Sequence, residues 1–121
     1  MRGPWLRPRE RPELRGLWGE AMQYNKLVRD KIPEIIEAQG ETPVTRVLEY
    51  EEYQACLEQK LREETAEYLE SRELDELADI LEVVYALCGA QGHSRAELEA
   101  AYKRKHQARG GFDKRIFLVS K

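Results

Sequence analysis

Two pairs of acidic residues, each with the i, i+3 spacing of a single helix face, stand on either side of a short turn in this sequence. They are Glu64 with Glu67, and Glu76 with Asp79. Residues three apart on a helix point the same way, one turn above the other. Both pairs lie equally far from the turn expected at residues 71–72. The sequence therefore predicts an antiparallel helical hairpin in which Glu64 faces Asp79 and Glu67 faces Glu76.

The distribution of charge along the chain indicates how these four acidic residues can be accommodated. Residues 49–82 hold 13 acidic side chains against three basic ones, whereas residues 95–121 hold eight basic against three acidic. The formal net charge of -3 thus hides a sharp separation along the chain. Clustered carboxylates repel one another unless water solvates them or a cation neutralises them. Two interpretations follow: a solvated helix face, or a site for a hard cation such as Mg²⁺ or Mn²⁺.

Apolar spacing and helix breakers predict a mainly α fold, an antiparallel helix bundle with a minor two-stranded β ribbon. Helices are expected from residue 30 to about 39, from 51 to about 70, from about 72 to 90, and from a capping box at Ser94 to about 108. The ribbon would pair residues 44–48 with 115–119. The second helix of the hairpin carries the stripe expected to be buried: Leu74, Leu77, Ala78, Leu81, Val84, Tyr85 and Cys88.

Residues 1–21 differ in composition from the rest of the chain, with three of the five prolines and both tryptophans. They are expected to be a disordered or non-native extension ahead of one domain over residues 22–121, and Met22 is a candidate translation start. No stretch approaches the roughly 20 apolar residues of a membrane span. The two cysteines lack the spacing of a disulfide framework or a zinc site. These features exclude membrane proteins, secreted disulfide scaffolds and zinc fingers, and favour a cytoplasmic location.

The acidic motif also resembles a known one. REETAEYLE followed by DELADILEVVYAL resembles the EExxE…ExxD signature of the all-α nucleotide pyrophosphohydrolases, the MazG-like superfamily, which includes phosphoribosyl-ATP pyrophosphohydrolase of histidine biosynthesis. The opening YNKLVRDKIPEII and the closing RGGFDKRIFL resemble a phosphoribosyl-ATP pyrophosphohydrolase-like subgroup, so the resemblance covers Tyr24–Val119. Residues 1–21 have no counterpart, and the gap between Glu67 and Glu76 is shorter than in many MazG-like proteins.

The resemblance implies that the protein hydrolyses the α–β phosphoanhydride of a nucleoside triphosphate, releasing a monophosphate and pyrophosphate. A non-canonical nucleotide removed as house-cleaning is one candidate substrate, and phosphoribosyl-ATP is the alternative. A third interpretation is a non-catalytic helical binding module. Its binding of nucleic acid is disfavoured, because the acidic surface repels a phosphate backbone.

For hydrolysis, Glu64, Glu67, Glu76 and Asp79 are the expected Mg²⁺ ligands, with Mn²⁺ as an alternative ion. Glu63, adjacent to this set but outside the mirrored pairs, is the candidate general base, and an ordinary surface glutamate is the alternative.

Four basic residues are candidate phosphate ligands: Lys26, Arg29, Lys105 and Arg109. Arginine offers a bidentate fork to phosphate oxygens and lysine a point charge, while a solvated surface position is the alternative for each. A hairpin with charged outer faces needs a further helical layer. We therefore expect a homodimer or a dimer of dimers, in which basic residues from one chain can face the acidic residues of its neighbour.

Overall fold

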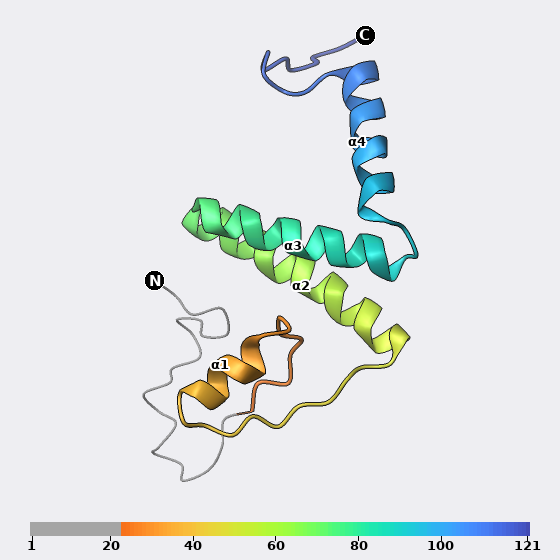
Figure 1. Ribbon diagram of the computed structural model, residues 1–121. Coiled ribbons are helices and arrows are strands. Elements are labelled where there is room, and N and C mark those ends of the chain that lie inside the picture. The colour runs from red at the N-terminus through yellow and green to blue at the C-terminus, as the bar shows by residue number, and fades with distance from the viewer. Residues whose placement is uncertain (1–22) are drawn as a thin grey trace. The chain divides into compact units, whose positions relative to one another are not determined.

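Four helices form the regular structure of the part of the chain that the computed structural model describes, residues 23–121. In chain order they are α1 (Ile32–Ala38), α2 (Tyr50–Ser71), α3 (Leu74–Ala90) and α4 (Arg95–Arg109) (Figure 1). The mainly α class is confirmed, and each helix ends within a few residues of its predicted bounds. The extension expected at residues 1–21 lies outside the described residues.

The predicted β ribbon is not confirmed, since residues 23–121 contain no β-strand. Both candidate segments, 44–48 and 115–119, run without strand pairing and hold most of their apolar side chains in solvent. A two-stranded ribbon is at best marginally stable in water unless another layer packs against it. The alternation of β-branched residues in the sequence indicates an extended backbone, but it does not indicate which segment would pair with it.

The chain divides into two compact units, residues 1–60 and 61–121, and each is described by itself. In the first unit, α1 has a proline in its first turn, and Gly40 follows its end with a φ of 85° that glycine adopts readily. Near the start of α2, the Arg46 guanidinium donates two hydrogen bonds to the Glu52 carboxylate, at 3.1 and 3.0 Å. This bidentate contact lowers the pKa of Glu52 and ties the approaching segment to the first turn of α2.

The second unit contains the helical hairpin. Residues 61–71 of α2 lie beside α3, and the turn between them consists of Arg72 and Glu73 (Figure 1). Arg72 has a φ of 60°, and the Ser71 hydroxyl accepts a hydrogen bond of 3.3 Å from the Glu73 backbone N–H. The turn therefore lies one residue beyond the position, 71–72, that the symmetry of the acidic pairs predicted. None of the helices within residues 23–121 is long and apolar enough to cross a membrane.

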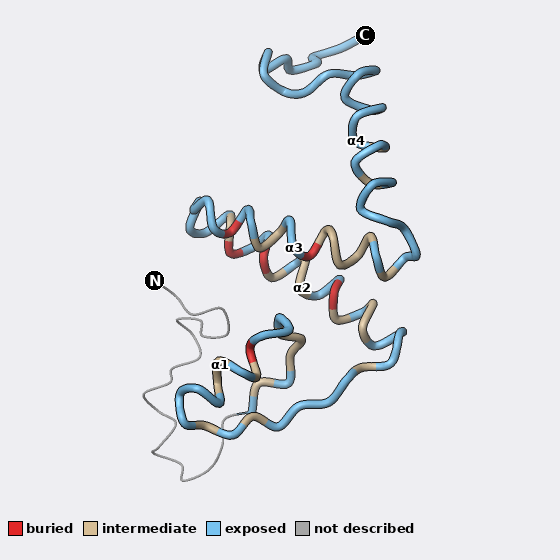
Figure 2. The backbone as a smooth tube through the Cα atoms, in the orientation of Figure 1, coloured by how far each residue is buried: buried red, intermediate tan, exposed pale blue. Residues whose placement is uncertain are grey.

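Burial in the second unit reverses what the apolar pattern predicts. Among residues 61–121, all of which are described, the buried residues are Glu64, Glu67, Glu76 and Val83 (Figure 2). Leu77 and Leu81, expected in the buried stripe of α3, are 45% and 48% exposed. That expectation is wrong for the isolated chain, because α3 turns its acidic face toward α2 and its leucines toward solvent.

Candidate metal centre

Three of the four predicted metal ligands meet inside the hairpin. Glu64 comes from α2, while Glu76 and Asp79 come from α3, and each offers a carboxylate oxygen within 4.8 Å of the other two. Glu76 is 0% and Glu64 2% exposed, and Asp79 is half-buried. We refer to these three residues as the acidic triad.

Helix geometry holds the acidic triad in place. Glu76 lies in the first turn of α3, where its backbone N–H donates a hydrogen bond of 3.1 Å to the Glu73 carbonyl. Asp79 follows one turn later on the same face. The first turn of a helix carries partial positive charge from its backbone N–H groups, which favours carboxylates there. The first turn of α3 is thus a suitable position for Glu76.

The remaining acidic candidates lie next to the acidic triad. Glu67 is one turn beyond Glu64 on α2 and is buried, at 9% exposed, but it is not one of the three residues whose oxygens lie within 4.8 Å. Glu63 is half-buried and precedes Glu64 directly. Its role as a general base stays a prediction.

The basic candidates are placed elsewhere. Lys105 and Arg109 lie exposed in the last turns of α4. Helix α4 meets the carboxyl end of α3, and from Asp79 to that end at Ala90 the rise of about 1.5 Å per residue gives roughly 16 Å. Within one chain, these two residues are therefore not beside the acidic triad. Lys26 and Arg29 belong to the first unit, ahead of α1.

The acidic triad fits a hard divalent cation. At 4.8 Å and an effective dielectric constant of 20, each pair of ionised carboxylates repels by about 3 kcal/mol. A cation or a proton between them removes this cost, and carboxylate oxygens are the ligands that Mg²⁺ and Mn²⁺ prefer. The chemistry of the donors and their burial on the inner face of the hairpin both suit such an ion.

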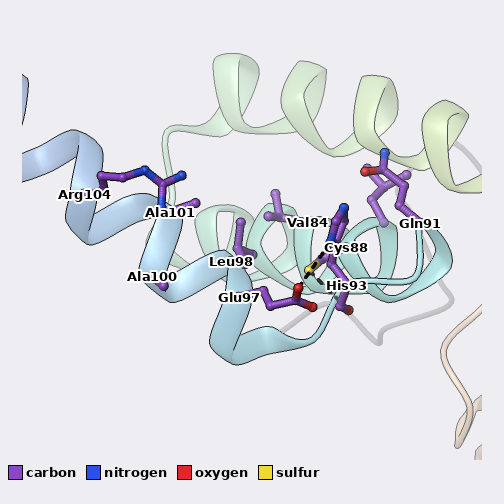
Figure 3. Close-up of a pocket in the computed structure, with 10 residues that line it drawn as sticks. Val84, Cys88, Gln91, His93, Glu97, Leu98, Ala100, Ala101 and Arg104 are labelled. Carbon is purple, nitrogen blue, oxygen red and sulfur yellow. Dashed lines mark hydrogen bonds and ion pairs between the residues drawn. The ribbon is translucent and has the colours of Figure 1, made fainter.

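Sequence reasoning missed a groove where α3 meets α4, with a volume of about 580 Å³ (Figure 3). Its lining combines apolar side chains with the polar Gln91, His93, Glu97 and Arg104. The residues that line it are Val84, Leu87, Cys88, Gln91, His93, Glu97, Leu98, Ala100, Ala101 and Arg104. The signal in the sequence was the apolar spacing on both sides of the turn before α4.

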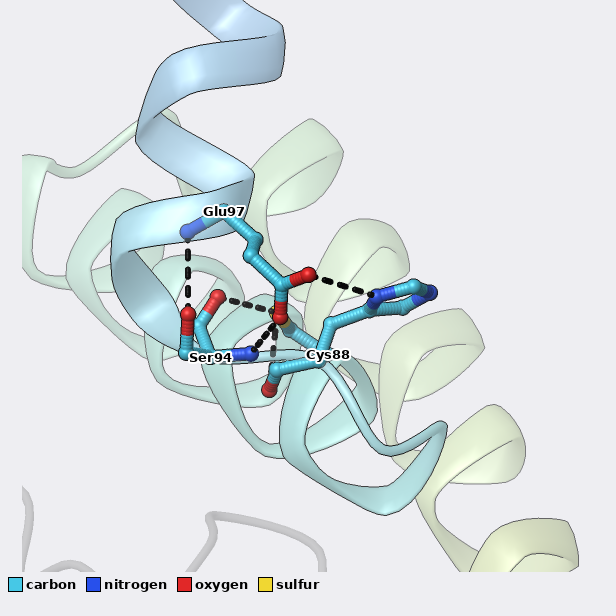
Figure 4. A network of polar contacts seen from close by, with 4 residues as sticks. Cys88, Ser94 and Glu97 are labelled. Atoms are coloured by element: carbon cyan, nitrogen blue, oxygen red, sulfur yellow. Dashed lines mark hydrogen bonds and ion pairs between the residues drawn. The ribbon is translucent and has the colours of Figure 1, made fainter.

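A capping box fixes the start of α4 and one wall of this groove (Figure 4). The Glu97 backbone N–H donates to the Ser94 hydroxyl at 3.1 Å, and the Ser94 backbone N–H donates to the Glu97 carboxylate at 2.7 Å. The predicted box is confirmed. The Ser94 backbone N–H is the main reason why the pKa of Glu97 is lowered, and His93, at 3.8 Å, adds to it. The Cys88 thiol donates to the Ser94 carbonyl at 3.4 Å, which links α3 to the cap.

A second contact between α3 and α4 involves Tyr85. The Arg95 guanidinium lies 3.6 Å from the centre of the Tyr85 ring, and the Tyr85 hydroxyl donates to the Glu99 carboxylate at 3.3 Å. One face of this ring is therefore covered by Arg95. Together with the cap, this contact sets the angle at which α4 leaves α3.

Comparison with known proteins gives a partial match. No protein-family model matches the chain, and no solved structure does. A protein of Mycolicibacterium smegmatis (strain ATCC 700084 / mc(2)155), described as an uncharacterized protein, is 60% identical over 42 residues. Those residues make up 35% of this chain and 43% of the relative, so the match spans less than half of that protein.

Proposed function

We propose that the protein is a Mg²⁺-dependent nucleotide pyrophosphohydrolase. It would cleave the α–β phosphoanhydride of a nucleoside triphosphate to a monophosphate and pyrophosphate. The observation that carries the proposal is the acidic triad, Glu64, Glu76 and Asp79, gathered on the inner face of the hairpin while leucines of α3 face solvent.

This arrangement, with acidic residues inside and leucines outside, is unusual for a folded chain in water. Burying carboxylates while exposing leucines is the reverse of what lowers the free energy of a folded chain in water. A bound cation converts the mutual repulsion of the acidic triad into attraction and stabilises the hairpin in this orientation. A solvated acidic face, the alternative from the sequence, predicts exposed side chains, whereas Glu64 and Glu76 are buried.

In the proposed reaction, Glu64, Glu76 and Asp79 hold the ion, with Glu67 one turn away to orient a ligand or a water molecule. When bound, Mg²⁺ supplies charge neutralisation on the phosphate oxygens and lowers the pKa of a coordinated water. Glu63 is the proposed general base, which accepts the proton of the attacking water at its carboxylate. Its half-buried position beside Glu64 leaves it access to solvent.

We further propose that the working form is a homodimer or a dimer of dimers, in which a second chain completes the helix bundle. Leu74, Leu77 and Leu81 would then be covered rather than exposed. The proposed phosphate ligands Lys105 and Arg109, which lie away from their own acidic triad, would reach the substrate at the neighbouring chain, with Lys26 and Arg29 as further candidates. The free cysteines Cys56 and Cys88 suit a reducing compartment, and we place the enzyme in the cytoplasm.

Pyrophosphate release tests the proposal. We expect Mg²⁺-dependent release with at least one nucleotide from a panel of canonical and non-canonical triphosphates and phosphoribosyl-ATP. The variant Glu64→Gln should lose about two orders of magnitude or more in rate, because a metal ligand is replaced by a neutral group. The exposed Glu70→Gln on the same helix is the matched control and should retain wild-type activity.

The panel also distinguishes the alternatives. If phosphoribosyl-ATP is the best substrate, the protein acts in histidine biosynthesis. If a non-canonical triphosphate is the best substrate, the protein removes such nucleotides as house-cleaning. Release that persists in EDTA or in Glu64→Gln would show that the acidic triad is not the catalytic site. No release with any nucleotide would favour the non-catalytic binding module.

A further inference from the structure

The chain after α4 presents an unusual amount of apolar surface. We call residues Phe112–Val119 the C-terminal arm. Its large apolar side chains are between 73% and 96% exposed: Phe112, Ile116, Phe117, Leu118 and Val119. Exposed large apolar side chains at this density mark an interaction surface or an aggregation hazard. A backbone hydrogen bond of 3.0 Å from Arg115 N–H to the Phe112 carbonyl, with Arg115 at a φ of 55°, shapes the first turn of the arm.

A second apolar surface runs along α3 in the same unit. Its residues, which we call the α3 track, are Leu74, Leu77, Leu81, Val84 and Cys88. They recur at alternating steps of three and four residues, which places them on one helix face. The three leucines are exposed, and Val84 and Cys88 line the groove of about 580 Å³ against α4 (Figure 3). The groove is thus the covered end of a longer apolar face.

The extended part of the arm is shorter than the α3 track. Residues 112–115 form a turn, and residues 116–119 reach at most roughly 13 to 14 Å when extended. From Leu74 to Cys88 the helical rise gives about 21 Å. The extended part of the arm can therefore lie along about two thirds of the track.

The arm of the same chain cannot do this. It begins beyond α4, a helix of 15 residues, which is about 22 Å long. To return to α3 it would spend most of its reach alongside α4, arriving at the groove but not at Leu74–Leu81. The arm of a second copy has no such constraint.

Charge favours the same pairing. Every charged residue of α3 is acidic, and Asp75 and Glu82 are exposed beside the track. The arm carries Lys114 and Arg115 next to its apolar run, against one acidic residue, Asp113. Opposite charges at the rim of an apolar contact guide its formation and register.

The area is also adequate. Each buried phenylalanine side chain removes about 150 to 250 Å² from solvent. Reciprocal docking of two arms buries four such rings, roughly 600 to 1,000 Å², before the aliphatic side chains and the covered track are counted. Stable interfaces bury about 1,200 to 2,000 Å² in total, so the four rings alone supply about half of that area, and the aliphatic side chains and the covered track add to it.

We propose that the C-terminal arm of one chain docks on the α3 track of a second copy, and that the exchange is reciprocal. The interface is then isologous, with the same arm and the same track used twice. This inference rests on the homodimer of the proposed function and is independent of nucleotide hydrolysis.

Disulfide trapping between two chains tests the contact. Each chain is the full-length protein in a Cys56→Ser, Cys88→Ser background and carries one new cysteine. Phe117→Cys marks the arm, Leu81→Cys marks the track, and the neighbouring Glu82→Cys is the matched control on α3. Arm and track chains carry tags of different size, and are mixed and mildly oxidised.

We expect a disulfide-linked dimer of mixed size from Phe117→Cys with Leu81→Cys, at least about fivefold more abundant than with Glu82→Cys, because a disulfide requires closely placed Cβ atoms. Equal yields from the two pairs would overturn the proposal. So would a chain carrying both Phe117→Cys and Leu81→Cys that forms a disulfide within itself and none between chains.

A second measurement does not depend on where the cysteines are placed. The double variant Phe112→Ser, Phe117→Ser should weaken dimerisation at least about tenfold in analytical ultracentrifugation, with unchanged helicity, since both residues lie outside the helices. An unchanged dissociation constant would contradict the proposal. Trapped dimers that release no pyrophosphate would support the arm contact while contradicting the proposed hydrolysis, so the two failures are distinguishable.

Discussion

At the scale of single residues, Glu76 is the most deeply buried of the acidic side chains among the described residues. It is fully buried in the first turn of α3, within 4.8 Å of Glu64 and Asp79. Three ionised groups at this distance repel one another strongly when nothing neutralises them. We therefore expect a divalent cation bound to the acidic triad to raise the stability of the protein.

Replacing Glu76 by glutamine tests this balance. Glu76→Gln removes one charge at nearly constant volume. We therefore expect the free energy of unfolding of the metal-free variant at pH 8 to be about 1 to 3 kcal/mol higher than that of the wild type. The same variant should lose most of the stabilisation that Mg²⁺ gives the wild type. Thermal unfolding with and without Mg²⁺ measures both effects, and Glu82→Gln on the same helix is the control. A wild-type response to Mg²⁺ in Glu76→Gln would contradict the assignment.

The capping carboxylate gives a prediction about pH. The pKa of Glu97 in the folded chain is lowered below its ordinary value of 4.5, first by the hydrogen bond from the Ser94 backbone N–H. Its contribution to stability is therefore present above pH 4.5 and is lost as the pH falls through the lower folded value. We expect the melting temperature of the wild type to fall more steeply below pH 4.5 than that of Glu97→Gln. Parallel pH profiles of the two proteins would show that this contact does not titrate as described.

Residue spacing predicted that Glu64, Glu76 and Asp79 would come together, but it also placed Glu67 opposite Glu76, and Glu67 is not one of the three residues of the acidic triad. The mirrored positions of Glu64 and Asp79 about the turn brought them level, and Glu76 joined them. What spacing could not predict was which helix face turns inward. Hydrophobicity favours Leu77 and Leu81 inside, and the structure places Glu76 there instead.

At the scale of elements, α3 has two faces with conflicting needs. Its acidic face meets α2, and its apolar face, the α3 track, is left to solvent except where α4 covers its end. Helix bounds followed from local signals such as Pro33, Gly40 and Ser94, because caps and turns are decided within a few residues. The prediction of a β ribbon is not confirmed, because strand pairing depends on a partner far away in the sequence that local patterns do not identify.

The capping box makes α4 sensitive to a single side chain. Ser94→Ala removes the hydroxyl that accepts the Glu97 N–H bond, and a loss of this kind costs about 1 kcal/mol. We expect the free energy of unfolding in urea to fall by about that amount, with α4 fraying at its start. Ser120→Ala, outside every helix, is the control. No difference between these two variants would indicate that water replaces the cap without cost.

At the scale of the whole molecule, the exposed leucines and the C-terminal arm predict self-association. A dimer should have twice the monomer mass of 14.2 kDa, which light scattering after size exclusion measures directly. Leu81→Asp places a charge in the centre of the α3 track and should shift the population to monomers by disfavouring burial there. Val44→Asp, in an exposed segment of the first unit, is the control. A wild type that stays monomeric at tens of micromolar would contradict the proposed dimer.

The account as a whole depends on whether the acidic triad binds a divalent cation, and Mn²⁺ measures this most directly. Titration of the full-length protein with Mn²⁺, with the free ion followed by electron paramagnetic resonance, should show at least one bound ion per chain that Mg²⁺ displaces. Asp79→Asn should weaken binding about tenfold or more, because a charged ligand is lost. Asp75→Asn, an exposed residue one turn earlier on the same helix, should bind as the wild type does. Absence of binding to the wild type, or equal binding by Asp79→Asn, would contradict the metal centre.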